Sequence, residues 1–301
     1  MNEEKEIRVN INCPICGPNT GYQIIYKENF PPSEIIFSTR KTPDNYHYRI
    51  VKCNRCGLLY SNPILKNNKI DKLYKESKFD YDVELENLKE TYGYYLKKVE
   101  KLIPSKENLL EIGCGNGFFL EKALEMNYKN VYGIEPSDEA IKKASLMVKD
   151  KIIPEGFDKK YFQDNFFDVI CIFQVIEHIA DLDKLLEGCF KCLKKNGVVL
   201  CISHNVDSFF SKILKDKCPI INNEHIYIFS KKTLQKIFLR KKFQVIEIGS
   251  VANIYSLNYW FKMMPIPRFL KKIIFNLSSF LKISNKKIKI KAGNIFIIAK
   301  K

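Results

Sequence analysis

The sequence predicts an α/β protein with a Rossmann-like sheet and a small N-terminal module that binds a metal ion. The first observation behind this prediction is the run Leu109–Leu120, in which an apolar stretch, three glycines and an apolar helical pattern follow one another. Such a run is typical of a strand, a tight turn and a helix that place a ligand at the end of a parallel strand. The second observation is two cysteine pairs near the N-terminus. With 301 residues, the chain has room for one α/β domain and one small module.

The glycine-rich turn has an unusual chemical character. Gly113, Gly115 and Gly117 allow positive φ angles and a close approach of backbone to ligand. A phosphate-binding turn usually has a further glycine where Phe118 stands. The acid Glu111 precedes the turn, and its carboxylate would repel a pyrophosphate but hold an amino group. The turn therefore suits a zwitterionic nucleoside better than a dinucleotide.

These residues resemble the first motif of class I S-adenosylmethionine (SAM) methyltransferases. Three later segments resemble the second strand of that family with its terminal acid, the fourth strand with its loop, and the turn into strand five: Val131–Ser137, Phe166–His178 and Lys194–Leu200. The resemblance implies a seven-stranded methyltransferase sheet, SAM as cofactor and methyl transfer as the activity. The alternative is a doubly wound domain that binds another ligand.

The resemblance also implies which residues bind SAM. Glu135 is expected at the ribose hydroxyls. Phe157 stands where many relatives have an acid near the adenine, so the contact there is expected to be ring stacking or backbone. The full expected set is Glu111, Gly113, Cys114, Gly115, Gly117, Glu135, Pro136, Phe157 and Gln174.

The cysteine pairs predict a structural zinc site. Each is a CxxC motif followed by glycine, so that two turns can direct four thiolates at one ion; the expected ligands of Zn²⁺ are Cys13, Cys16, Cys53 and Cys56. Four protein ligands leave no open position, so catalytic zinc is not expected, and two matched pairs make a redox role less favoured. Cys189 and Cys192 lie in the helical pattern Leu182–Leu193 and are expected in the core.

We expect three parts: residues 1–66 as the zinc-binding module, residues 67–104 as a linker and helical cover, and residues 105–301 as the methyltransferase domain. Shorter elements are expected as strands over residues 22–26, 35–37, 48–51, 243–249 and 294–299, and as helices over 84–103, 137–149 and 230–239. Residues 152–157 are expected to hold strand three and the loop after it. By family topology, strands six and seven form an antiparallel edge, and residues 251–291 are an insertion between them.

The insertion combines apolar and basic residues. The chain has a formal net charge of +16, and no acid follows Glu247. Residues 268–283 predict a basic amphipathic helix, with one face formed by Phe269, Ile273, Leu277, Phe280 and Leu281. This face is expected either to pack beside the active site or to lie on an anionic membrane or lipid carrier. No apolar run is long enough to span a membrane and no secretory signal is visible, so we expect a cytoplasmic protein, with contact to the inner membrane face as an option.

Histidines are the candidate catalytic bases, because an alcohol acceptor gains from a group that takes its proton near neutral pH. His178 follows strand four and His225 follows strand five, both at the sheet edge that faces the cofactor. The alternative for Glu177–His178 is a packing pair that shapes the loop. His47 is expected on the surface of the N-terminal module.

The pairing of this zinc module with this methyltransferase type resembles enzymes that methylate sugars. It implies O- or C-methylation of a nucleotide-linked or lipid-linked sugar in polysaccharide biosynthesis. An RNA methyltransferase is an alternative, although nucleic acid is less expected because the segment between Cys13 and Cys56 has no run of basic residues. A non-catalytic SAM-binding scaffold is the third reading. The sequence specifies neither the acceptor atom nor the oligomeric state.

Overall fold

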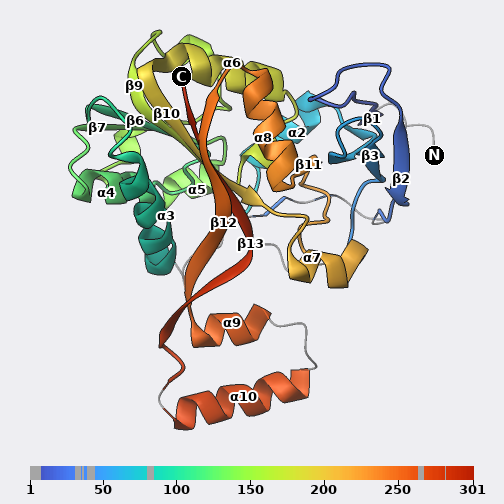
Figure 1. Ribbon diagram of the computed structural model, residues 1–301. Coiled ribbons are helices and arrows are strands. Elements are labelled where there is room, and N and C mark those ends of the chain that lie inside the picture. The colour runs from blue at the N-terminus through green and yellow to red at the C-terminus, as the bar shows by residue number, and fades with distance from the viewer. Residues whose placement is uncertain are drawn as a thin grey trace.

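A seven-stranded sheet forms the centre of the molecule (Figure 1). The structure is a computed structural model that describes residues 8–30, 35, 37–38, 45–79, 85–263, 268–281 and 283–301. In chain order the strands are β6 (Asn108–Ile112), β7 (Asn130–Ile134), β8 (Ile152–Ile153), β9 (Phe167–Phe173), β10 (Leu193–His204), β12 (Gln244–Ser256) and β13 (Lys287–Lys300). They are arranged as β12-β13-β10-β9-β6-β7-β8, which confirms the Rossmann-like sheet expected from the sequence.

The sheet is mostly parallel, and its one antiparallel edge lies where the sequence predicts it. The pairs β10–β9, β9–β6, β6–β7 and β7–β8 are parallel. At the other edge β12 and β13 pair antiparallel, as expected. Because β13 is also antiparallel to β10, it alone runs against the rest, and β12 has the direction of the other five strands.

The core covers both faces of the sheet. All seven residues of β9 and all five of β6 are buried, as expected for parallel strands between two helical layers. Side chains alternate between the faces. Leu110 and Ile170 belong to the core under helices α6 (Leu182–Cys192) and α8 (Lys231–Arg240). Leu109 and Val169 belong to the core under α3 (Leu85–Val99) and α4 (Phe118–Glu125).

The described helices are α2 (Asn67–Lys75), α3 (Leu85–Val99), α4 (Phe118–Glu125), α5 (Asp138–Lys142), α6 (Leu182–Cys192), α7 (Phe209–Leu214), α8 (Lys231–Arg240), α9 (Leu257–Met263) and α10 (Arg268–Phe280). Two expectations were wrong. The linker at residues 67–75 is helical, because Ile70 and Leu73 bury one side of it. The helix expected over 137–149 ends at Lys142, since the chain turns inward to bury Val148 in the core.

The N-terminal module (residues 1–66) is built on a second, antiparallel sheet. Its own strands are β2 (Tyr22–Tyr26), β3 (Ile50–Cys53) and β4 (Leu59–Ser61), and a two-residue strand from the other end of the chain, β11 (Tyr227–Ile228), pairs with β4 as the fourth. A separate pair joins β1 (Arg8–Val9) to β5 (Ile64–Leu65). No strand forms at the described residues 35 and 37, contrary to expectation, and residue 36 lies outside the described residues.

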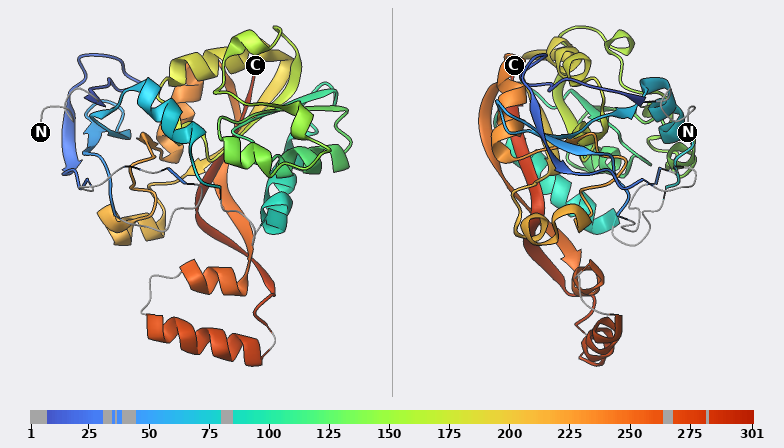
Figure 2. Two further views of the ribbon diagram at one scale, coloured as in Figure 1. Left: turned by 180° about the vertical axis from the view of Figure 1, so that it is seen from behind. Right: turned by 90° about the vertical axis from the view of Figure 1, so that its right-hand side faces the viewer.

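The insertion is smaller than expected and stands away from the body. Pairing of β12 with β13 continues as far as Ser256 and Lys287, so residues 251–256 and 287–291 belong to a long two-stranded ribbon and not to an insertion. Helices α9 and α10 lie at the far end of this ribbon (Figures 1 and 2). None of the helices in the described part of the chain has the length and apolar character that a membrane span requires.

Candidate functional site

The glycine turn after β6 has the geometry that the sequence predicts. The φ angles of Gly113, Gly115 and Gly117 are +74°, +56° and +75°, which side chains other than glycine rarely adopt. A Cβ atom on Gly113 would lie 2.3 Å from Cγ2 of Val175, so only glycine fits there. Gly117 lies at the N-terminus of α4, behind the turn, where a Cβ atom would meet the side chain of Val148 at 2.7 Å.

Two carboxyl groups flank this turn, the buried Glu111 and the half-buried Glu135. Glu135 is fully engaged, since it accepts hydrogen bonds from the backbone N–H groups of Gly115 at 2.8 Å and Ser137 at 2.9 Å. Glu111 is 2% exposed, and its Oε2 atom has no hydrogen-bond partner among the described residues. Burial, and then the neighbouring Glu135, raise the pKa of Glu111 well above its ordinary value. An ammonium group would donate the missing hydrogen bond to this oxygen, so the carboxyl group of Glu111 fits the methionine part of SAM.

A cavity of about 1880 Å³ opens over the carboxyl ends of β6, β7 and β9. The residues that line it include eight of the nine expected at the cofactor: Glu111, Gly113, Cys114, Gly115, Glu135, Pro136, Phe157 and Gln174. Gly117 is the exception. The Phe157 ring packs toward α6, where a Cβ atom on Gly188 would lie 2.7 Å from it, so its contact with an adenine stays a prediction.

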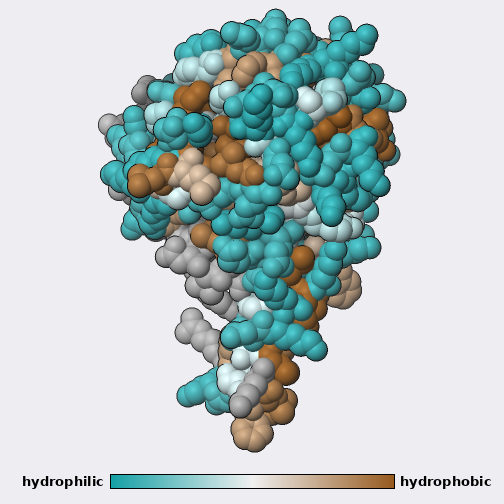
Figure 3. Space-filling view, turned by 90° about the vertical axis from the view of Figure 1, so that its left-hand side faces the viewer, coloured by the Kyte–Doolittle hydropathy of each residue, from teal (hydrophilic) through white to brown (hydrophobic). Residues whose placement is uncertain are grey.

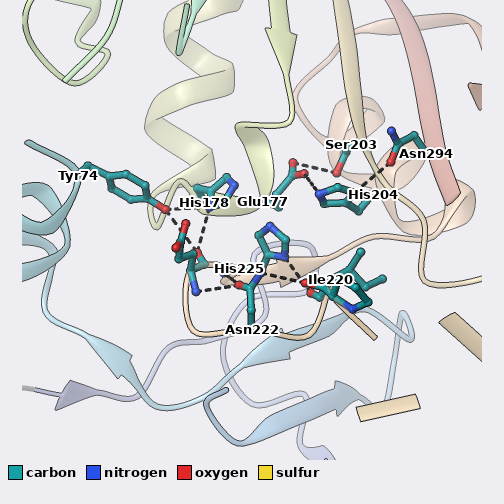
Figure 4. A network of polar contacts seen from close by, with 11 residues as sticks. Tyr74, Glu177, His178, Ser203, His204, Ile220, Asn222, His225 and Asn294 are labelled. Atoms are coloured by element: carbon teal, nitrogen blue, oxygen red, sulfur yellow. Dashed lines mark hydrogen bonds and ion pairs between the residues drawn. The ribbon is translucent and has the colours of Figure 1, made fainter. Parts of the chain in front are cut away.

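A cluster of histidines faces the same cavity (Figure 4). The ring centres of His178 and His225 are 4.6 Å apart, and those of His204 and His225 are 5.0 Å apart. The structure thus brings together the two histidines singled out in the sequence and adds His204, which was not. His204 is the last residue of β10, so its place at the carboxyl end of a central strand was the signal available.

His225 has a defined proton arrangement. Its Nδ1 atom lies 2.8 Å from the carbonyl oxygen of Ile220, and a carbonyl oxygen only accepts, so Nδ1 carries the proton and Nε2 has a free lone pair. Burial, followed by the neighbouring His178 and His204, lowers the pKa of His225 well below its ordinary value. The imidazole is therefore neutral near pH 7 and can accept a proton.

His178 is held from the opposite side. Its Nδ1 atom lies 2.8 Å from the hydroxyl oxygen of Tyr74 and 3.1 Å from the carbonyl oxygen of Glu224. Burial lowers the pKa of His178, and the neighbouring Glu177 opposes this in part. Tyr74 belongs to α2, where the sequence predicts a linker, so the sequence gives no sign that Tyr74 lies at this site.

Glu177 closes the cluster (Figure 4). Its side chain is buried, Oε2 accepts a hydrogen bond from Ser203 at 3.0 Å, and Oε1 lies 3.6 Å from Nε2 of His204 without a hydrogen bond. One oxygen of Glu177 and one nitrogen each of His178 and His225 lie within 4.8 Å of one another, so these donors can also hold a divalent cation.

The cysteine cluster has the geometry of a closed tetrahedral site. Its four sulfur atoms lie within 4.8 Å of one another and belong to Cys13, Cys16, Cys53 and Cys56. The glycine after each pair has positive φ and returns its N–H to the first cysteine's carbonyl oxygen, at 2.8 and 3.0 Å. Burial raises the pKa of Cys13 to about 11, whereas backbone N–H groups outweigh burial at Cys53 and lower its pKa to about 6. The cluster fits a zinc ion, which requires four thiolates.

His47 was expected at the surface of this module, and that expectation was wrong. Its side chain is 3% exposed, and Nδ1 lies 2.7 Å from the carbonyl oxygen of Tyr48. Backbone hydrogen bonds with Asn29 in both directions hold it inward.

When the seven strands of the central sheet are numbered one to seven in chain order, from β6 to β13 without β11, their spatial order is 3-2-1-4-5-7-6. This order and the glycine turn with its two carboxyl groups define a Rossmann-like domain suited to a nucleoside ligand. The family described as "Methyltransferase domain" matches residues 85–248, more than half of the chain. The chain belongs to this family.

Similar proteins align over the same region. Ubiquinone biosynthesis O-methyltransferases from Rhizobium etli and Pelagibacter ubique are 28% and 35% identical over 102 and 106 residues, 32% of this chain in each case. The tRNA U34 carboxymethyltransferase of Campylobacter fetus is 29% identical over 152 residues, 48% of this chain. These matches span 41%, 42% and 53% of the relatives' own lengths.

Solved structures align with this chain at low identity. A SAM-dependent methyltransferase from Archaeoglobus fulgidus is 21% identical with a TM-score of 0.49, over 74% of this chain and 100% of that one. The complex of the Haloferax volcanii Trm112 methyltransferase activator with a methyltransferase gives 16% identity and the same TM-score, over 77% of this chain and 97% of the matched one.

Proposed function

We propose that the chain transfers a methyl group from SAM to an oxygen or an acidic carbon of a sugar-bearing acceptor. The observation that carries the proposal is one cavity lined both by the glycine turn with its unpaired Glu111 oxygen and by His225 with its free Nε2 lone pair. The sulfonium activates the methyl group, so the protein mainly has to align acceptor and donor.

The chain's own residues then have separate roles. Glu111 pairs with the ammonium group of SAM, and Glu135 lies where the ribose is expected. As the acceptor atom forms its bond to the methyl carbon, the carbon–sulfur bond breaks, and His225 Nε2 takes the acceptor's proton. His178 and Glu177 orient the acceptor beside it. The products are the methylated acceptor, S-adenosylhomocysteine and a proton bound to His225.

The acceptor class rests on lysines in the cavity lining, which also contains acidic residues. Lys75 and Lys217 line the cavity, as do Lys72 and Lys184, which form ion pairs with Glu76 and Asp158. Ammonium groups at the rim suit a diphosphate, which both nucleotide-linked and lipid-linked sugars carry. The N-terminal module supports the cavity wall, and we assign its cysteine cluster to a structural zinc ion.

Two measurements test this function. Calorimetry should show one SAM site, and the protein should transfer radiolabelled methyl groups to members of a nucleotide-sugar panel. Absence of SAM binding would exclude methyl transfer from SAM, and SAM binding without transfer would leave a scaffold. An intermediate of ubiquinone biosynthesis is the second acceptor to include, because the aligned relatives carry the name ubiquinone biosynthesis O-methyltransferase. Assays with tRNA test the RNA alternative, whose binding should weaken steeply with salt. Transfer to tRNA or to the ubiquinone intermediate alone would contradict the sugar assignment.

A further inference from the structure

Helix α10 carries an apolar face that no element of the described residues covers. Phe269, Ile273, Leu277 and Phe280 recur at spacings of four, four and three residues and therefore share one side of the helix. Their side chains are 65%, 58%, 56% and 83% exposed. Figure 3 shows hydrophobic residues gathered along one edge of the projecting helical pair.

The opposite side of α10 faces α9 and the cavity (Figure 1). Lys271 and Phe275 line the cavity described above, and Ser278 is buried. These three positions are offset by about half a turn from the exposed apolar residues. The exposed side is therefore not a surface that rests on the domain, which overturns that reading of the sequence.

The sequence of the segment that carries the apolar face is basic. Residues 257–286 contain six lysines and arginines and no acid: Lys262, Arg268, Lys271, Lys272, Lys282 and Lys286. Lys272 is exposed at the flank of the apolar side. An apolar stripe with basic flanks fits the boundary between the acyl chains and the head groups of an anionic bilayer.

The ribbon gives this face a free approach to a flat surface. β12 and β13 carry α9 and α10 beyond the body, so no other described element lies around the helical pair in either view (Figure 2). We propose that the α10 apolar face binds the surface of an anionic lipid bilayer. The chain then lies on the membrane with the α10 side of its cavity close to the lipid, which, if the proposed function holds, gives access to a lipid-linked acceptor.

Vesicle sedimentation of the full chain tests the proposal. Vesicles of phosphatidylcholine mixed with phosphatidylglycerol should pellet the protein at low salt, and vesicles of phosphatidylcholine alone should not. The only tryptophan of the chain, Trp260, lies in α9 and reports on the helical pair. Lipids brominated in the acyl chain should therefore quench its fluorescence.

Two variants distinguish binding through the α10 face from nonspecific binding to lipid. Phe280→Asp should bind anionic vesicles at least about tenfold more weakly. The substitution removes a phenyl ring that the proposal places in the bilayer and adds a charge that anionic lipid repels. The matched control is Phe209→Asp in α7, since Phe209 is similarly exposed, at 72%, and belongs to the body. Circular dichroism and SAM affinity check that both variants fold.

Three outcomes would overturn the proposal: no binding to anionic vesicles, equal binding to neutral ones, or equal loss in both variants. A dimer in size-exclusion chromatography that Phe280→Asp dissociates would instead assign the face to a second copy of the chain. The vesicle test needs neither SAM nor an acceptor. Its failure is therefore distinguishable from a failure of methyl transfer to a soluble nucleotide sugar.

Discussion

At the scale of single residues, Glu111 shows how one buried group can oppose stability and serve binding. Its carboxyl group is buried beside Glu135, and one oxygen lacks a partner among the described residues. The pKa in the folded protein is therefore raised above the unfolded value. Folding takes up a proton above the unfolded pKa, so this group lowers the free energy of unfolding as pH rises from the unfolded pKa through the folded one.

Glu111→Gln should separate these two effects. The SAM dissociation constant should rise about 30-fold or more, because the ammonium group loses a buried ionic partner. At neutral pH the free energy of unfolding should be unchanged or higher by about 1 kcal/mol or more, since the unfavourable buried charge is gone. Calorimetry and urea unfolding measure the two quantities. A less stable variant with normal SAM affinity would contradict this role.

His225 should determine the acid side of the activity profile. Because burial and neighbouring histidines lower its pKa, the neutral base persists below pH 6.5, and kcat/KM should fall only at lower pH. His225→Asn should lower kcat about 10²-fold or more with SAM affinity unchanged. His178→Asn is the comparison: a larger loss there would identify His178 as the base.

At the scale of elements, the pairing of β11 with β4 connects the N-terminal module to the histidine cluster. Ser61, at the end of β4, donates one hydrogen bond from its hydroxyl group to the carbonyl oxygen of His225 at 2.9 Å and another from its N–H to Ile226 at 2.8 Å. Ile226 in turn donates to the carbonyl oxygen of Glu177 at 2.8 Å. The module thus fixes the backbone on which His225 stands.

Ser61→Ala should therefore lower kcat by about threefold to tenfold and leave SAM affinity unchanged, because one hydrogen bond contributes about 1 kcal/mol. The matched control is Ser105→Ala, which removes the 2.7 Å hydrogen bond to Asp168 at the other end of the sheet. Single-turnover rates should separate the two variants, while thermal unfolding should shift similarly in both. Equal rates would show that the β4 contact has no positioning role.

Elements whose signal is local were predictable. α6 and α8 appear within one residue of the expected bounds, and β9 begins one residue after the start of the segment expected to hold it and its loop, because apolar runs and helical periodicity are carried by neighbouring residues. β11 was not predictable, since a two-residue strand owes its existence to a partner far away in the sequence. The same reason applies to the extension of β12 and β13, which hydrogen-bond to each other beyond the sheet.

At the scale of the whole molecule, the sequence located both sites but not their relation. The glycine motif and the cysteine pairs mark two sites because their chemistry depends on residue type and spacing. That Tyr74 and His204 would join His178 and His225 depends on packing between distant segments, which no single motif carries. The sequence motifs therefore identify individual candidate residues, and the tertiary structure brings them together into the histidine cluster.

If the N-terminal module holds the proposed zinc ion, this assembly predicts that the ion affects catalysis from outside the cavity. In the cysteine cluster, Cys53 ends β3 and Cys56 lies between β3 and β4, and β4 holds β11 and the backbone of His225. Removing zinc, by a chelator or by Cys16→Ala, should loosen this sheet because ion binding and folding of such a site are coupled.

Methyl transfer should then fall strongly while SAM still binds, since the glycine turn and Glu111 belong to the central sheet. Zinc content, measured by a colorimetric chelator, should decrease in parallel with kcat and not with SAM affinity. A zinc-free chain with full activity would mean that the hydrogen bonds of β4 hold His225 without the ion. Parallel loss of SAM affinity would mean instead that module and sheet unfold as one cooperative unit.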